Sequence, residues 1–278
     1  MIFKKKRLPI NTPGFLIIGA QKSGTTALFS YLAKHPHLIP STTKELHFFS
    51  TESQYSNGFE YYHSNFPNRT CKKEIFFEAS PSYLASAEAC ERIYKYNKNI
   101  KLIVLLRNPI YRAYSAWNMY KERYQNNIDW FFDDWLASFN SFDCDNIIKR
   151  SSQKIFSFAD YIREEFDCIN TGGSRIEAQV LMQGKYYEYL KRYLKRFPKK
   201  NILIIENEEL NSSLIDKLSY IEWFLGVDKH DWRGEGLSKV FEGNYSSEID
   251  IASFEFLKEF YKPYNERLFE LIGKRFDW

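Results

Sequence analysis

Residues 15–26 join a short apolar run to a turn rich in glycine and hydroxyl groups, and a helix-like pattern follows. Residues 15–18 are continuously apolar, and residues 19–26 form the turn. Apolar side chains then recur at helical spacing from Leu28 to Leu32, in a pattern that runs up to His35. A continuous apolar run indicates a strand buried on both faces, because a half-exposed strand alternates apolar and polar residues. The segment therefore predicts a strand, a loop and a helix of an α/β fold.

The same alternation of buried strands and helices returns along the chain. Further strands are predicted at residues 75–77, 101–106 and 201–205, and further helices from Pro109 onward, over 186–197 and over 254–272. This order predicts a three-layer αβα sandwich with a central parallel sheet. The 278 residues, 44% of them hydrophobic, show no repeat and no long linker. We therefore expect a single domain over residues 1–278.

Charge and cysteine content exclude several classes of function. The net charge is +4, and the 39 Lys and Arg residues are spread among 35 Asp and Glu residues. No basic stripe is present, so we expect no nucleic-acid partner. No apolar run is long enough for a membrane span, which predicts a cytoplasmic protein. The four cysteines form no CxxC pair, which predicts free thiols and no metal site.

The turn at residues 19–26 has the composition of an anion-binding loop. A strand that feeds a glycine-rich turn into a helix N-terminus gathers backbone N–H groups and the positive end of the helix dipole. The signature of nucleotide triphosphatases is GxxxxGK[ST], whereas this turn reads GxxxxGTT and carries its lysine inside the loop, at Lys22. The fold is therefore predicted to be P-loop-like, with a phosphate or a sulfate at this loop.

The strand at residues 101–106 ends in Arg107, where a triphosphatase carries an acidic residue that holds magnesium. A cation at that position repels a metal and attracts a second anionic group. We therefore predict a ligand with two separated anionic groups and no metal. A nucleotide kinase remains an alternative if Glu206 or Glu208, after the strand at residues 201–205, supplies the acid.

Five segments resemble PAPS-dependent sulfotransferases, which use 3′-phosphoadenosine 5′-phosphosulfate (PAPS) as donor. They are residues 15–26 (FLIIGAQKSGTT), 44–49 (KELHFF), 77–83 (FEASPSY), 105–115 (LLRNPIYRAYS) and 260–273 (FYKPYNERLFELIG). The motifs are most similar to those of the heparan sulfate N- and 3-O-sulfotransferase type. The resemblance covers nearly the whole chain in the right order, and it suggests a bacterial member.

The resemblance implies which residues bind the donor. The 5′-phosphosulfate would contact Lys22, Ser23, Gly24, Thr25 and Thr26. Arg107 and Ser115 would bind the 3′-phosphate, and Lys239 and Gly243 would belong to a late loop over the nucleotide. Asn108 is expected to cap the helix that begins at Pro109, which places Ser115 almost two turns along it.

The resemblance also implies a mechanism, in which Glu45 is the general base and Lys22 stabilises the leaving group by in-line displacement. His47 is an alternative base, since an imidazole titrates near neutral pH. The alternative for Glu45 is that it has no catalytic role and is a surface carboxylate that pairs with Lys44. The acceptor is expected to be a hydroxyl or an amine of a glycan. A lipid, a small-molecule alcohol, a protein tyrosine and an inactive nucleotide-binding protein remain alternatives.

Two positions depart from the pattern of the glycan enzymes. Ala79 stands after Glu78 where enzymes of the 3-O type often carry a second catalytic lysine. Thr26 stands where they carry arginine, and here the Thr-Thr pattern of the N-sulfotransferases is followed. Both departures concern the acceptor and leave its identity open.

Overall fold

Five short apolar segments form the strands of one sheet in the computed structural model, which describes residues 11–126, 157–171, 179–237 and 248–278. The strands are β1 (Pro13–Gly19), β2 (Leu38–Pro40), β3 (Ile75–Ala79), β4 (Lys101–Leu106) and β5 (Ile202–Glu206). Their order is β2-β3-β1-β4-β5, and all neighbouring pairs are parallel. The predicted central parallel sheet is confirmed.

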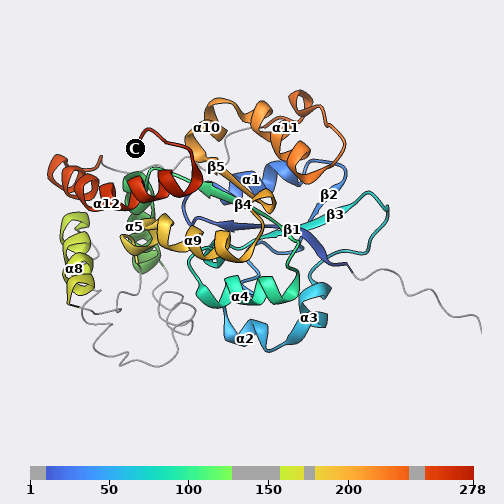
Figure 1. Ribbon diagram of the computed structural model, residues 1–278, viewed down its shortest axis with the longest axis horizontal. Helices are drawn as coiled ribbons and strands as arrows, with labels where there is room; N and C mark the ends of the chain where they lie inside the picture. Colours follow the sequence, from blue (N-terminus) through green and yellow to red (C-terminus); the bar gives the residue numbers. More distant parts are fainter. Residues whose placement is uncertain (1–10, 127–156, 172–178, 238–247) are drawn as a thin grey trace, which may run out of the picture.

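Side chains of β1 alternate between two separate apolar cores. Leu16 and Ile18 pack into the core shared with α4 (Ala87–Tyr96) and α9 (Tyr186–Arg196). Phe15 and Ile17 pack into the core shared with α1 (Thr25–Leu32), α10 (Asn207–Ser212) and α11 (Leu214–Leu225). Because successive residues of a strand point to opposite faces, helices are needed on both sides, and Figure 1 shows them there. This confirms the three-layer αβα sandwich.

A third apolar core lies at one end of the molecule. It is formed by α5 (Pro109–Asn126), α8 (Phe158–Asn170) and α12 (Ile251–Ile272), which lie together beside the sheet in Figure 1. Two short helices, α2 (Glu52–Tyr55) and α3 (Gly58–Ser64), follow β2 and pack near α4. None of the helices in the described residues is long and apolar enough to cross a membrane.

Capping residues set the ends of the long helices. The side chain of Asn108 accepts a hydrogen bond from the backbone N–H of Ile110 (3.0 Å), which confirms the predicted cap of α5. Asp250 caps α12 by accepting from Ser253 N (2.8 Å), so this helix begins three residues before the prediction. Gly273 ends α12 with a φ of 71°, as its position after the last apolar residue predicted.

Two features of the fold differ from the prediction. The three-residue strand β2 lies at an edge of the sheet and was not predicted, since it is too short to show a periodic pattern and ends in Pro40. Helix α1 ends at Leu32, three residues before the predicted end at His35. Cys71, Cys90 and Cys168 are free thiols, as predicted, and Cys144 lies outside the described residues.

Candidate active site

The loop after β1 is shaped by residues in the left-handed backbone region. Gly24 has a φ of 90° and Lys22 a φ of 63°. Gly24 directly precedes α1, whose first backbone N–H groups therefore face the loop and have no partner within the helix. The side chain of Asn207, the first residue of α10, donates to the carbonyl oxygen of Ser23 (3.0 Å). This hydrogen bond fixes the loop against the carboxyl end of β5.

Arg107, which was predicted to bind a second anionic group, lies against the same loop. Its guanidinium donates to the carbonyl oxygen of Lys22 (3.4 Å). Burial lowers the pKa of the Lys22 ammonium, and repulsion from Arg123 and Arg107 lowers it further. Three cations thus converge at the carboxyl ends of β1 and β4, where ligands of open α/β sheets bind. Arg123, on the last turns of α5, was not singled out from the sequence.

The side chain of Ser23 also suits an anionic ligand in this loop. The residue is fully buried, and its hydroxyl has no hydrogen-bond partner of good geometry among the described residues. The neighbouring hydroxyl of Tyr186 donates to the carbonyl oxygen of Arg107 instead (3.0 Å). Buried hydroxyl groups are almost always satisfied, so Ser23 is suited to donate to an oxyanion in this loop.

The remaining predicted donor residues lie at the start of α1, on α5 or outside the described part of the chain. Thr25 and Thr26 are the first two residues of α1. Ser115 is 2% exposed on α5, the helix capped by Asn108. Tyr120 on the same helix shares a hydrogen bond with Gln21 (3.0 Å), which joins the donor loop to α5. Lys239 and Gly243 both fall within residues 238–247, which are not described.

Glu45 lies on a loop that follows β2 and packs against the end of β3. Its backbone N–H donates to the carbonyl oxygen of Ala79 (3.0 Å), and the backbone N–H of His47 donates to Oγ of Ser80 (3.1 Å). Glu45 and His47 have φ values of 64° and 51°. A left-handed conformation costs a residue other than glycine about 1–2 kcal/mol, and such residues concentrate at functional sites. The loop thus holds both side chains at the same edge of the sheet as Lys22.

Lys44 and His47 face the Glu45 carboxylate. Burial alone raises its pKa, but the interactions with His47 and Lys44 outweigh burial and lower the pKa to about 2. Lys44 Nζ forms a close ion pair with Oε1, and His47 Nε2 lies 3.6 Å from Oε2. The side chain remains 42% exposed. Glu45 is therefore ionised at neutral pH and accessible. It pairs with Lys44, and it also lies beside the donor loop.

Glu78 supports this loop from within the core. Its buried carboxylate accepts hydrogen bonds from Tyr62 (2.7 Å), Tyr83 (2.9 Å) and Ser80 (2.8 Å). Burial raises the pKa of Glu78, and the three hydroxyl donors oppose that shift. Because Ser80 also accepts from the backbone of His47, Glu78 anchors the loop that carries Glu45.

The acids considered for magnesium have other partners. Glu206 at the end of β5 accepts from the indole N–H of Trp278 (2.6 Å), and Glu208 accepts from the backbone N–H of Asn108 (3.3 Å). Both contacts are structural, since one holds the C-terminal residue and the other holds the start of α5. This geometry gives the kinase alternative no support.

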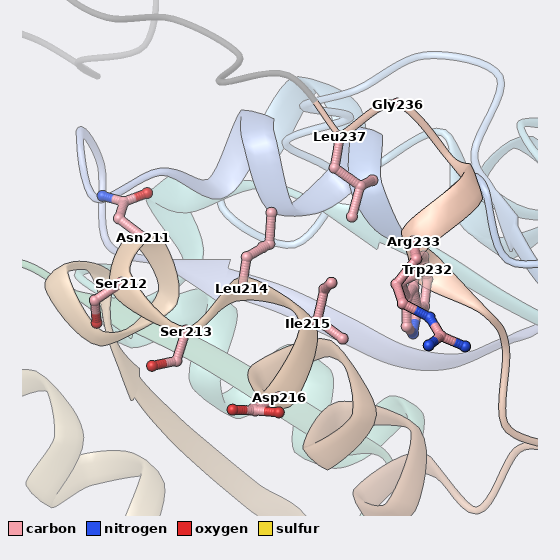
Figure 2. A pocket seen from close by; sticks show the side chains of 10 residues that line it. All are labelled: Asn211, Ser212, Ser213, Leu214, Ile215, Asp216, Trp232, Arg233, Gly236 and Leu237. Carbon is pink, nitrogen blue, oxygen red and sulfur yellow. The ribbon is translucent and has the colours of Figure 1, made fainter.

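A pocket of about 520 Å³ lies beside α10 and α11 (Figure 2). It is lined by residues 211–216 and by Trp232, Arg233, Gly236 and Leu237. Figure 2 shows Leu237 and Leu214 pointing toward each other across it, while Asp216 and Arg233 lie at its rim. None of the predicted site residues within the described ranges lines this pocket.

The sequence matches the sulfotransferase domain family over residues 12–274. Mouse heparan sulfate glucosamine 3-O-sulfotransferase 5 is 25% identical over 286 residues, which cover 96% of this chain and 74% of the mouse protein. Human heparan sulfate glucosamine 3-O-sulfotransferase 3B1 is 28% identical over 287 residues, which cover 96% of this chain and 65% of the human protein.

The fold is similar to a sulfotransferase from Alicyclobacillus acidocaldarius, whose crystal structure superposes with a TM-score of 0.68 at 25% identity. The superposition covers 95% of this chain and 97% of the bacterial one. Sequence and fold therefore agree over almost the whole length. The chain belongs to the sulfotransferase domain family, and it is a PAPS-dependent sulfotransferase.

Proposed function

We propose that this sulfotransferase transfers the sulfuryl group of PAPS to a hydroxyl or an amine of a glycan, with Glu45 as general base. Relatives that align with 96% of this chain are named heparan sulfate glucosamine 3-O-sulfotransferases, which supports a glycan acceptor. The observation that carries the mechanism is the placement of Glu45 near Lys22. The charge of Glu45 raises the pKa of Lys22 against the effects of burial and of Arg107.

The donor is proposed to bind by its two anionic ends. Lys22, the buried hydroxyl of Ser23 and the N-terminus of α1 suit the 5′-phosphosulfate. Arg107 and Ser115, at the end of β4 and on α5, suit the 3′-phosphate. The repulsion that lowers the pKa of Lys22 in the free protein is relieved when these anions arrive.

The reaction needs an acceptor oxygen or nitrogen in line with the leaving phosphate. Glu45 takes the proton of the acceptor as the new bond to sulfur forms. The bond between sulfur and the bridging oxygen breaks, and Lys22 stabilises the charge that develops on the released nucleotide phosphate. Positioning and charge stabilisation supply most of the acceleration in such transfers.

The free enzyme keeps Glu45 a weak base, because His47 and Lys44 lower its pKa to about 2. Bound PAPS brings negative charge to the same edge of the sheet. A neighbouring like charge raises the pKa of a carboxyl group, so donor binding increases the basicity of Glu45. This order matches an enzyme that abstracts a proton only when the donor is in place.

Transfer from radiolabelled PAPS tests the proposal directly. A desulfated heparan sulfate oligosaccharide, a nitrophenol and a long-chain alcohol are offered as acceptors. We expect the label only or mainly in the oligosaccharide. Glu45→Gln should lower kcat about 10²–10⁴-fold, the usual contribution of a positioned base. Lys22→Ala should lower it about 10²–10³-fold, as for loss of one charge-stabilising donor.

Matched controls are available on the surface of the same protein. Glu60→Gln on α3 and Lys98→Ala after α4 change exposed side chains and should keep wild-type turnover. A folded Glu45→Gln enzyme with near-normal turnover would show that Glu45 is not the base. Label in the alcohol or the phenol but not in the oligosaccharide would reject the glycan acceptor and keep the sulfotransferase chemistry.

A further inference from the structure

A serine hydroxyl holds the imidazole that faces Glu45. Nδ1 of His47 lies 2.9 Å from Oγ of Ser82, and Nε2 of the same ring lies 3.6 Å from Oε2 of Glu45. Both nitrogens of the ring are thus engaged, so a contact that fixes Nδ1 also fixes the direction of Nε2. We propose that Ser82 is a positioning residue that orients His47 toward Glu45; this inference rests on the proposed function of Glu45 as base.

Ser82 is itself held in place by a second hydroxyl. Its Oγ lies 2.9 Å from Oγ of Ser50, and Ser50 lies 3.3 Å from the carbonyl oxygen of His47. The contact with the carbonyl oxygen is long for an O–H donor. We therefore assign the proton of Ser50 to Ser82 and the proton of Ser82 to Nδ1 of His47.

This assignment leaves the proton of a neutral His47 on Nε2, the nitrogen that faces Glu45. The opposite tautomer directs a bare nitrogen lone pair at a carboxylate, which is repulsive. The hydroxyl at position 82 therefore selects the tautomer as well as the orientation of the ring. Oε2 of Glu45 then faces the N–H of His47, and Oε1, which pairs with Lys44, is the oxygen that the acceptor proton would reach.

The backbone alone does not fix the ring. The N–H of His47 is held by Ser80, and Ser80 donates to the buried Glu78. The imidazole side chain, however, is 41% exposed, so packing leaves its rotation open. The contact with Ser82 supplies the missing constraint from the segment that follows β3.

Three further ionisable groups lie near His47 and Glu45. Lys44 lies on the same loop, Lys22 lies on the donor loop, and Glu78 lies at the end of β3. Without Ser82, His47 can turn away and Glu45 is left to pair with Lys44 alone. Loss of His47 as a partner raises the pKa of the Glu45 carboxyl, since that interaction lowers it in the intact protein.

Kinetics of Ser82→Ala over a range of pH test this inference. We expect kcat to fall about three- to tenfold, the effect of one hydrogen bond, while the KM for PAPS stays unchanged. The acid limb of kcat/KM should move to higher pH, because it reports the pKa of Glu45 in the free enzyme. Ser82→Thr keeps a hydroxyl and should restore both quantities, and thermal unfolding shows that each variant is folded.

Glu45→Gln, assayed in parallel, separates this inference from the proposed function. If Glu45→Gln is inactive while folded Ser82→Ala has wild-type kcat and pH profile, Ser82 does not position His47. If Ser82→Thr is as impaired as Ser82→Ala, the hydroxyl is not the cause and the inference is also wrong. Normal turnover of Glu45→Gln would show that Glu45 is not the base, whatever result Ser82→Ala gives.

Discussion

Replacing Gly24 by alanine tests whether the donor loop needs both a left-handed backbone and close contact with α10. Gly24 has a φ of 90°, and a Cβ atom at this position collides with the side-chain amide of Asn207. That amide donates to the carbonyl oxygen of Ser23, so it cannot move aside without losing its hydrogen bond. The change therefore strains the loop and breaks its link to β5.

Two contributions set the size of the effect. A left-handed conformation costs alanine about 1–2 kcal/mol relative to glycine, and a lost hydrogen bond costs about 0.5–1.5 kcal/mol. We expect Gly24→Ala to lower the free energy of unfolding by about 2–3 kcal/mol. The affinity for the desulfated nucleotide should fall at least about tenfold, since a displacement of this loop that costs about 1.4 kcal/mol already has that effect.

Gly58→Ala is the matched control. Gly58 has a φ of 80°, and a Cβ atom there meets nothing within 4 Å. It lies at the start of α3, away from the donor loop. This variant should show only the backbone contribution, about 1–2 kcal/mol, and wild-type affinity for the nucleotide. Urea unfolding measures the free energy of unfolding, and titration calorimetry measures nucleotide affinity.

A double variant isolates the collision. Asn207→Ala removes the obstacle as well as the hydrogen bond, so Gly24→Ala combined with it should be less destabilised than the two single changes predict together. If Gly24→Ala is no less stable than Gly58→Ala and binds the nucleotide normally, the reasoning about this loop is refuted. If the loss of stability in the double variant equals the sum of the two single losses, the collision does not contribute.

Two further predictions concern stability. Burial lowers the pKa of His35, which accepts from His37 N (3.0 Å) and lies 2.9 Å from the carbonyl oxygen of Asp228. As the pH falls, the unfolded chain therefore binds a proton at position 35 before the folded protein does. The free energy of unfolding should then fall as the pH drops through about 6.5. His35→Gln should reduce that slope in urea titrations at several pH values, and an unchanged slope contradicts the assignment. Asp250→Ala removes the cap of α12 and should cost about 0.5–2 kcal/mol, whereas Asp250→Asn should cost much less; equal losses would show that capping is not the cause.

The strands of the fold were predictable because they are buried on both faces. β4 occupies the predicted residues 101–106, and β1, β3 and β5 include the predicted runs within one or two residues. A parallel strand covered by helices is a continuous apolar run, which stands out in a sequence. The edge strand β2 carries no such signal, since its three residues owe their conformation to pairing with β3.

The site was predictable only as far as local motifs reach. Lys22 and Arg107 were predicted to follow two strands of one parallel sheet, and the structure places Arg107 against the loop of Lys22. Arg123, Asn207 and Ser82 were missed, because they act through contacts between residues far apart in the chain. Position alone offered a signal for Asn207, which directly follows β5 at the edge where ligands bind.

The sheet itself sets the spacing between the proposed base and the donor loop. β1 pairs with β3 so that Ile17 lies opposite Ala79, and the N–H of Ser80 donates to the carbonyl oxygen of Ile17 (3.1 Å). The carbonyl oxygen of Ala79 in turn accepts from Glu45. A slip of one residue moves a strand by about 3.3 Å, which is as large as the distance between reacting atoms in a productive complex, about 3–3.5 Å. The register of β1 and β3 is therefore a requirement of the proposed chemistry, whereas surrounding side chains can change with the acceptor.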